Sequence, residues 1–274
     1  MSSLYHRVKD HFRLRRDLAR AGIAGKSRVF NWLQQASQLK NNRLSDASFD
    51  LFTYHGEDGI LLYLIKQVHN APTYFVDIGA GDCIKGNCTN LAVHFGWTGL
   101  FIDMDGEKLS KGRKFYNRLK PDSPPVFLEA KVTPANINQL ISEAHLPGEI
   151  GLLSIDVDGN DYWIWKAIDL VRPKIVVIEA KVEFGLRDAV VPYSESNHRD
   201  RNLQCNGASV EALRKLGAEK GYKLVGSNKQ GYNLFFVQAE EEVPEVQTEF
   251  LLSDPAVKKS FYPDSFFANH TFAG

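Results

Sequence analysis

The sequence predicts an α/β fold in which helices cover both faces of a largely parallel, doubly wound sheet. Short apolar segments rich in β-branched residues recur along the chain and alternate with segments of helical periodicity. Carboxylates follow several of these segments, at the places where parallel strands would end. The 274 residues are enough for one domain of this kind with additions at its ends.

The composition is that of an ordinary globular protein, with 43% hydrophobic and 24% charged residues. A net charge of zero offers no support for a nucleic-acid partner. Cys83, Cys88 and Cys205 form no C-x-x-C pair, so neither a disulfide framework nor a zinc site is predicted. The first residues lack the apolar core of a signal peptide, and no run approaches about 18 apolar residues. We therefore expect a cytoplasmic protein without a transmembrane segment.

Residues 1–48 form a basic segment ahead of the predicted domain. Up to Arg43 this segment carries ten lysines and arginines against Asp10 and Asp17. Its apolar residues recur at roughly helical spacing, which predicts one or two amphipathic helices. We expect this helical arm to pack on its own domain or on a second copy of the chain in a homo-oligomer. A basic amphipathic helix can also contact an anionic membrane or a nucleic acid.

Residues 50–68 contain a turn followed by a helix. The turn runs from Gly56 to Gly59, and the apolar run after it has the length of a helix. Glu57 and Asp58 therefore lie at a helix start, where carboxylates are favoured and where a plain cap would explain them.

The pattern most informative about a ligand begins at residue 74. The predicted strand 74–78 ends in Gly79-Ala80-Gly81, where the missing side chains let the backbone turn sharply and approach a ligand. In the dinucleotide pattern G-x-G-x-x-G a third glycine follows, but Ile84 stands at that position. The preceding acid gives the pattern D-x-G-x-G instead, which begins at Asp77.

This turn opens a β-loop-α-β unit. A helix is predicted over 89–95 and a second strand over 97–102. Asp103 follows that strand, about 20 residues past the turn, where an acid can bind the two hydroxyls of a ribose.

The later elements continue the alternation. We predict a helix over 107–119, a strand over 126–132, a helix over 137–144, and strands over 150–155 and 174–178. A polar stretch at 183–206 precedes a helix over 207–220 and a hairpin of strands over 222–225 and 233–237.

Three carboxylates and an amide follow the strand 150–155, in the phrase D-V-D-G-N-D at 156–161. Ligands of open α/β sheets bind at such strand ends. The phrase superficially resembles a calcium loop, but position 12 of that loop would be Ala167 and a strand precedes it, so an EF-hand is excluded. The aromatic residues at 162–165 suit either the faces of a sugar or the packing of the next helix.

Two further segments have a predicted role outside the sheet. The stretch 183–206 is long for a loop and is expected to close over an acceptor. His198 is its one side chain that can be tuned as a base near neutral pH. The tail, residues 240–274, carries apolar and aromatic residues and is expected to dock on the domain or on a subunit partner.

The pattern from Asp77 to Gly81 resembles the nucleotide loop of class I S-adenosylmethionine (SAM) methyltransferases. The phrases G-E-D-G at 56–59 and I-D-V-D-G-N-D at 155–161 are similar to those of the FkbM-related group of this family. The resemblance spans about 50–238 and implies a methyltransferase domain over 49–239. Its fold would be a Rossmann-like sheet of seven strands, the last of which inserts antiparallel to the rest.

The resemblance also implies a cofactor and its contacts. SAM would be held at its methionine end by Asp77 and at its ribose by Asp103, with the glycine turn passing beside it. The full set of implied cofactor contacts is Glu57, Asp77, Gly79, Ala80, Gly81, Asn87, Asp103, Met104 and Lys131.

The activity implied is O-methylation of a hydroxyl on a sugar or glycan precursor. Asp156 or His198 would accept the proton of that hydroxyl. In metal-dependent relatives of this fold, acids at the tips occupied here by Asp156 and Glu179 hold a Mg²⁺ ion, for which carboxylate oxygens are suitable ligands. Related sequences often have an aromatic residue and Asn after that glutamate, whereas this chain has Ala180 and Lys181, which puts a third ligand there in doubt.

Several alternatives stay open at this stage. Asp156 could act as a base alone, with Glu179 purely structural. The acceptor could be an amine or a small phosphorylated metabolite, because acceptor choice lies in the irregular stretch 183–206. A non-catalytic SAM-binding subunit and a nicotinamide oxidoreductase are the remaining alternatives, the latter disfavoured by the absent third glycine.

Overall fold

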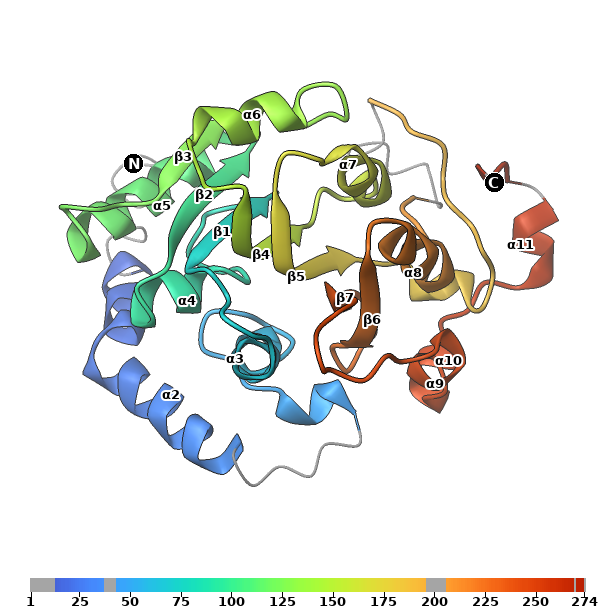
Figure 1. Cartoon of the computed structure of the whole chain (residues 1–274), viewed down its shortest axis with the longest axis horizontal. Helices are drawn as coiled ribbons and strands as arrows, with labels where there is room; N and C mark the ends of the chain where they lie inside the picture. Colours follow the sequence, from blue (N-terminus) through green and yellow to red (C-terminus); the bar gives the residue numbers. More distant parts are fainter. Residues whose placement is uncertain (1–12, 37–42, 196–205, 269, 274) are drawn as a thin grey trace, which may run out of the picture.

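A central sheet with helices on both faces forms the body of the molecule in the computed structural model (Figure 1). The structure describes residues 13–36, 43–195, 206–268 and 270–273. The seven strands lie in the order β3 (Val126–Glu129), β2 (Thr98–Asp103), β1 (Tyr74–Ile78), β4 (Glu149–Ile155), β5 (Arg172–Glu179), β7 (Asn233–Gln238) and β6 (Tyr222–Ser227).

The sheet is parallel from β3 to β5, and the closing hairpin is antiparallel. β7 inserts between β5 and β6 and runs antiparallel to both. The predicted Rossmann-like, doubly wound sheet of seven strands with an antiparallel closing strand is therefore confirmed. None of the helices within the described residues has the length and apolarity needed to cross a bilayer.

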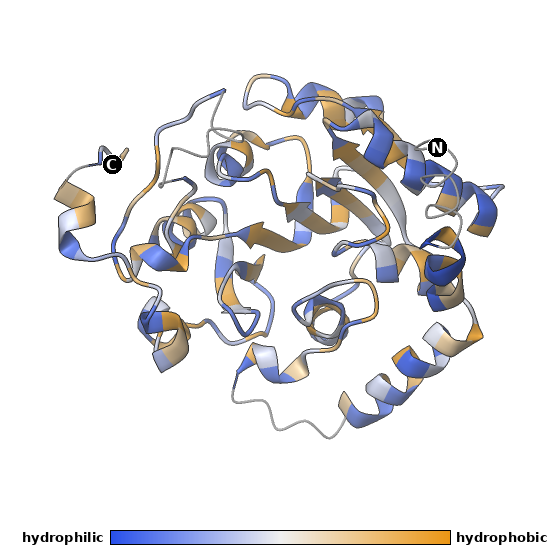
Figure 2. Cartoon of the chain, turned by 180° about the vertical axis from the view of Figure 1, so that it is seen from behind, coloured by the Kyte–Doolittle hydropathy of each residue, from blue (hydrophilic) through white to orange (hydrophobic). Residues whose placement is uncertain are grey.

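Successive side chains of the buried strands point to opposite faces of the sheet and pack into two separate hydrophobic cores. Phe75 of β1 joins the core under one face, while Val76 and Ile78 join the core under the other. The helices on the first face are α3 (Glu57–Gln67), α4 (Thr89–His94) and α5 (Gly106–Leu119), and those on the second are α6 (Ile137–Glu143), α7 (Asp161–Ala167) and α8 (Val210–Glu219). Figure 2 shows the apolar strands enclosed by helices of mixed polarity.

Strand register places the predicted site residues at one edge of the sheet. Ile78 of β1 pairs with Ile102 of β2 and with Ile155 of β4. The residues that follow these three positions therefore emerge side by side, as parallel strands require.

The basic arm packs on its own domain. Residues 13–21 are helical, and α2 (Ile23–Ala36) follows them. Val29 and Trp32 of α2 are buried in the first core, and Trp32 stacks on Phe49 with ring centroids 6.0 Å apart. Ile23 and Phe30 on the outer face of α2 are exposed.

The arm also reaches the glycine turn. Arg13 donates a hydrogen bond from Nη2 to Oδ2 of Asp82 at 2.6 Å. Asp82 directly follows the turn, so the arm is tied to the segment that the sequence identified as a ligand loop.

The tail runs along the opposite side of the domain. It contains the short helices α9 (Thr248–Leu251), α10 (Pro255–Lys258) and α11 (Asp264–Ala268). Its aromatic residues surround Phe184 in η2 (Val182–Phe184), with Phe272 5.5 Å and Phe267 6.0 Å from it between ring centroids. The tail thus docks on its own domain through these rings.

Tail and arm meet over the edge strand β6. Val246 donates a backbone hydrogen bond to Leu224 of that strand at 2.8 Å. Arg43, just before η1 (Leu44–Ala47), donates from Nη2 to Ser253 Oγ at 2.6 Å and lies 4.6 Å from the ring centroid of Phe250. These contacts cover one edge of the sheet.

Candidate functional site

The turn after β1 depends on two glycines with different roles. Gly79 and Gly81 have φ angles of 80° and 58°, in the left-handed region that favours glycine. A Cβ at Gly79 would overlap the carbonyl oxygen of Asp156, so its absence lets the ends of β1 and β4 approach each other. A Cβ at Gly81 would meet nothing within 4 Å, because this residue faces open space.

Asp103 ends β2 and fixes this turn. Its Oδ2 accepts a hydrogen bond from the Gly81 backbone N–H at 2.7 Å, and its Oδ1 accepts one from Asp105 at 2.8 Å. The residue is only 9% exposed. Each carboxylate oxygen can accept more than one hydrogen bond, so Asp103 keeps acceptor capacity for a ligand.

Asp77 lies buried beneath the turn with one oxygen unpaired. Its Oδ2 has no hydrogen-bond partner among the residues that the structure describes. Burial raises the pKa of Asp77 to about 6, although hydrogen bonds from Cys88 and Ser154 favour the ionised form. Asn87 reaches the same place and donates from Nδ2 to Ser154 Oγ at 3.0 Å. A buried acceptor without a partner suits a ligand that carries an N–H donor.

A crevice of about 360 Å³ opens beside the turn, a volume within the usual range for small-molecule sites. Its lining includes Gly79, Gly81, Asp103, Met104, Lys131, Asp156, Asp158 and Asn160. The structure thus brings together predicted residues from the ends of β1, β2, β3 and β4. Asp77, Ala80 and Asn87 are not part of this lining.

Two lining residues bind the backbone of residues 194–195. Lys131 donates from Nζ to the Glu195 carbonyl at 2.7 Å, and Asn160 donates from Nδ2 to the Ser194 carbonyl at 2.9 Å. The predicted base His198 belongs to 196–205, outside the described residues.

The segment after β4 folds back on itself. Asp158 and Gly159 have φ angles of 56° and 120°, which reverse the chain before α7 begins at Asp161. Asp161 accepts hydrogen bonds from the backbone N–H groups of Val157 at 2.9 Å and Gly159 at 3.0 Å. These bonds return the Asp161 carboxylate to the strand tip that carries Asp156.

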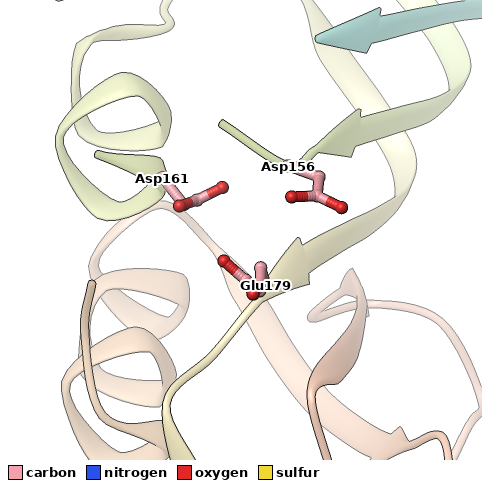
Figure 3. A group of neighbouring side chains, drawn as sticks. All are labelled: Asp156, Asp161 and Glu179. Carbon is pink, nitrogen blue, oxygen red and sulfur yellow. The ribbon is translucent and has the colours of Figure 1, made fainter. Parts of the chain in front are cut away.

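Three carboxylates face one another at the tips of β4 and β5. Asp156 directly follows β4, Glu179 is the last residue of the neighbouring parallel strand β5, and Asp161 is the first residue of α7 (Figure 3). One oxygen from each lies within 4.8 Å of the others. Asp161 is buried, Glu179 is partly buried, and Asp156 is exposed to the crevice.

Crowding of like charges changes how these groups titrate. Lost hydration in the crevice and then the negative charge of Glu179 raise the pKa of Asp156 well above its usual range. Burial and then Glu179 raise the pKa of Asp161 to about 7, against the two backbone hydrogen bonds that favour its ionised form. The cluster therefore holds a proton more readily than isolated carboxylates do.

Lys181 forms the one ion pair that these three carboxylates make within the described part of the chain. Its Nζ lies 3.0 Å from Oε1 of Glu179. Burial lowers the pKa of Lys181, but the Glu179 carboxylate outweighs this effect, so the net direction is upward and the ammonium stays charged. Glu179 Oε2 has no hydrogen-bond partner among the described residues.

Glu57 lies away from the crevice lining. Its buried carboxylate accepts hydrogen bonds from Asn228 and Asn233, both at 2.9 Å, and from the backbone of His55 at 3.0 Å. These bonds join the start of α3 to the β6–β7 hairpin, and a role of Glu57 in cofactor binding stays a prediction.

The aromatic residues of α7 lie outside the crevice lining too. Trp165 is buried against Phe236, with ring centroids 4.9 Å apart. Trp163 donates from Nε1 to the Val191 carbonyl at 2.9 Å. Both side chains therefore serve packing, the alternative that the sequence left open.

A larger cavity of about 530 Å³ lies elsewhere, between η1, β6 and the tail. Arg43, Ser227, Val243 and Phe250 are among its lining residues. It contains none of the predicted site residues and lies away from the carboxyl ends of the parallel strands, so the smaller crevice is the better candidate site.

The sequence reading missed Asp161 and Lys181 as members of the site. The acid-rich phrase at 156–161 carried a signal for Asp161, but its direction depends on the left-handed turn at Asp158 and Gly159. From the sequence, Lys181 was noted only because it stands where related sequences have a possible third metal ligand. In the structure its ammonium forms an ion pair with Glu179.

Some of the solved structures with a similar arrangement of elements are described as methyltransferases. Magnesium protoporphyrin IX methyltransferase from Synechocystis PCC 6803 with bound SAM matches with a TM-score of 0.42 and 12% identity, over 66% of this chain and 77% of that chain. The O-methyltransferase from Bacillus cereus in complex with S-adenosylhomocysteine (SAH) matches with a TM-score of 0.42 and 14% identity, over 77% of this chain and 89% of that chain. M. capricolum TrmK in complex with SAH matches with a TM-score of 0.39 and 10% identity, over 76% of this chain and 78% of that chain.

At these values the likeness does not assign an activity to this chain. No family model matches the sequence, and no curated protein matches it.

Proposed function

We propose that this protein is a SAM-dependent O-methyltransferase whose acceptor is a hydroxyl of a sugar or glycan precursor. The observation that carries the proposal is the glycine turn, held by Asp103 and open beside Gly81, above the Asp77 carboxylate, whose Oδ2 has no partner among the described residues. The comparison structures described with SAM or SAH agree with this cofactor, but the proposal is made from the turn and the strand tips.

The residues fit the cofactor part by part. Asp77 offers its unpaired, buried oxygen to the ammonium of the methionine end. Asp103 offers its remaining acceptor capacity to the ribose hydroxyls. Met104 and Lys131 line the crevice beyond β2 and β3, where an adenine would lie. Gly81 leaves the space that any side chain would reduce.

The chemistry follows from the strand tips on the other side of the turn. SAM supplies an electrophilic methyl group on a sulfonium. The acceptor oxygen would form a bond to this methyl carbon as the carbon–sulfur bond broke, and the hydroxyl would have to lose its proton. Asp156 is exposed to the crevice directly beside Gly79, so its carboxylate is the proposed proton acceptor. Holding oxygen and methyl collinear supplies most of the rate.

The donor set at the strand tips also fits a Mg²⁺ ion. Asp156, Asp161 and Glu179 come from three elements and offer only hard oxygen ligands. A bound Mg²⁺ would lower the pKa of an acceptor hydroxyl. Asp161 takes the place of the third ligand that Ala180 and Lys181 do not supply.

A sugar acceptor is proposed from the resemblance of 155–161 to the FkbM-related group. The α7 aromatic residues do not support it, since Trp163 and Trp165 are engaged in packing. The polar character of the crevice, with Asp156, Asp158 and Asn160 on one wall, agrees with a polyhydroxylated acceptor.

Calorimetric titration of the purified protein with SAH, with and without Mg²⁺ and with NADH as the comparison ligand, tests the cofactor. Micromolar SAH binding with no NADH binding is the expected result and would justify screening sugars, glycan precursors and amines for methyl transfer. Absence of SAH binding in both conditions would show that the turn is only structural, and the proposed function would be wrong.

A further inference from the structure

The Lys181–Glu179 ion pair lies inside the proposed Mg²⁺ site. The two side chains are 22% and 20% exposed, and the ammonium lies 3.0 Å from a carboxylate oxygen of a proposed ligand. A divalent cation at the three carboxylates would therefore have a fixed positive charge as a close neighbour.

The position of Lys181 is determined by the backbone around it. Its N–H donates to the Ala208 carbonyl at 2.9 Å, which anchors the main chain. Its aliphatic stem lies over Gly207, where a Cβ would be 2.9 Å from Lys181 Cγ. Gly207 has a φ of 81°, so glycine is favoured there. Because Gly207 has no side chain, the Lys181 side chain can extend past it to reach Glu179.

The formal charge around this pair is negative once its carboxylates are ionised. With all three ionised, as ligands of a cation must be, Asp156, Asp161 and Glu179 contribute three negative charges and Lys181 one positive charge, which leaves two. Asp158 and Asp77 add negative potential at Asp156, and Glu183 adds it at Lys181. A divalent cation would offset the two charges that remain on these four groups.

We propose that Lys181 sets the affinity of this site for divalent cations, by competing for Glu179 and by repelling the ion. The inference rests on the proposed Mg²⁺ site of the methyltransferase. In the absence of an ion, the ammonium holds Glu179 at the cluster and offsets part of its charge. When a divalent ion binds, the same ammonium opposes it, so the site binds the ion weakly and exchanges it readily.

The direction of the effect follows from Coulomb interactions. Two like charges a few ångströms apart, in a crevice with limited water, repel by more than the energy of a tenfold change in affinity. Loss of positioning of Glu179 would act in the opposite direction. Glu179 is also held by the backbone pairing of β5 with β7, where Glu179 lies opposite Asn233, so its position does not depend on Lys181 alone.

The test measures binding of Mn²⁺, from the electron paramagnetic resonance signal of the free ion, to the full chain with and without saturating SAH. Lys181→Met should bind Mn²⁺ at least about tenfold more tightly than the wild type. Lys181→Arg keeps the charge and should stay within about threefold. Lys114→Met removes an exposed lysine of α5 and controls for the change in net charge. Lys181→Gln serves as a second neutral variant if the methionine variant does not fold.

The outcomes separate this inference from the proposed function. Unchanged or weaker Mn²⁺ binding in both neutral variants would overturn it, as would the absence of Mn²⁺ binding in all variants. If the protein binds SAH but the Lys181 substitutions leave its affinity for Mn²⁺ unchanged, the inference fails and the methyltransferase proposal stands. If Mn²⁺ affinity rises as expected, and an Asp156→Asn and Asp161→Asn double variant loses it, the inference holds even where SAH binding is absent.

Discussion

The backbone N–H of Gly81 donates a 2.7 Å hydrogen bond to the carboxylate of Asp103, which joins the glycine turn to the tip of the next strand. Asp103→Asn leaves one acceptor oxygen for two backbone donors and lowers the negative charge offered to a ribose. We expect SAH affinity to fall at least about tenfold, because a donor left without its partner costs about 1–3 kcal/mol. Calorimetry measures the change.

Asp122→Asn is the matched control for this variant. Asp122 is exposed in the turn before β3, so the same change of charge there should leave SAH affinity unaltered. Equal SAH affinity in Asp103→Asn and the wild type would contradict a ribose contact at Asp103.

The two glycines of the turn should respond differently to alanine. Gly79→Ala places a Cβ on the Asp156 carbonyl, so we expect a loss of about 3 kcal/mol or more in the free energy of unfolding. Gly81→Ala meets no neighbour and costs about 1–2 kcal/mol for its left-handed backbone. It should fold and yet bind SAH weakly, since its methyl group occupies crevice space. Denaturant unfolding and SAH titration distinguish the two.

Asp156→Asn should separate cofactor binding from turnover. The amide cannot accept the acceptor's proton, so we expect kcat to fall by about 10²- to 10⁴-fold while SAH affinity stays within a few-fold. SAH formation with the acceptor found by screening measures kcat. Asp169→Asn, an exposed acid after α7, is the control. Preserved turnover in Asp156→Asn would remove this carboxylate from the mechanism.

His94 should make the contact between the arm and α4 sensitive to acid. It packs on Phe52, with ring centroids 5.9 Å apart, and its contact with the Arg20 backbone of the arm only partly offsets the cost of burying a charged ring. Burial lowers the pKa of His94 below its unfolded value of about 6.5. As pH falls, the unfolded chain therefore binds a proton at His94 before the folded protein does. The stability that this difference in pKa contributes is present above the unfolded pKa and is lost as pH falls below it.

Thermal unfolding between pH 7 and pH 5 measures this effect. The wild type should lose more Tm over this range than His94→Leu, which has no proton to bind there. His55→Leu, at an exposed histidine, should behave as the wild type. Parallel loss of Tm in the wild type and His94→Leu would show that His94 does not contribute.

Local sequence pattern was enough to predict the sheet. The strands around residues 76, 100 and 153 are continuous apolar runs, as buried parallel strands require, and glycines mark where the first one ends. Parallel pairing then places every strand tip at one edge, so Asp103 and Asp156 could be expected there from order alone. The third strand ends at Glu129 and not at Val132, because Glu129 pairs with Asp103, the last residue of β2, and β3 has no strand to pair with beyond it.

Side-chain direction could not be predicted in the same way. Asp161 reaches Asp156 only because two left-handed residues reverse the chain, and the pairing of Lys181 with Glu179 depends on the bare backbone at Gly207. The hydrogen bonds from Asn228 and Asn233 to the Glu57 carboxylate join residues more than 170 positions apart. Such contacts arise from the tertiary fold and leave no local pattern.

The cover over β6 has a consequence for the solution behaviour of the protein. An uncovered edge strand is a template on which another chain can add a strand, which leads to aggregation. Here Val246 occupies a backbone acceptor of β6, and the contact of Arg43 with Ser253 fastens the two covering segments together. Proteolytic removal of the tail would expose that edge, and the remaining protein would be prone to self-association through it.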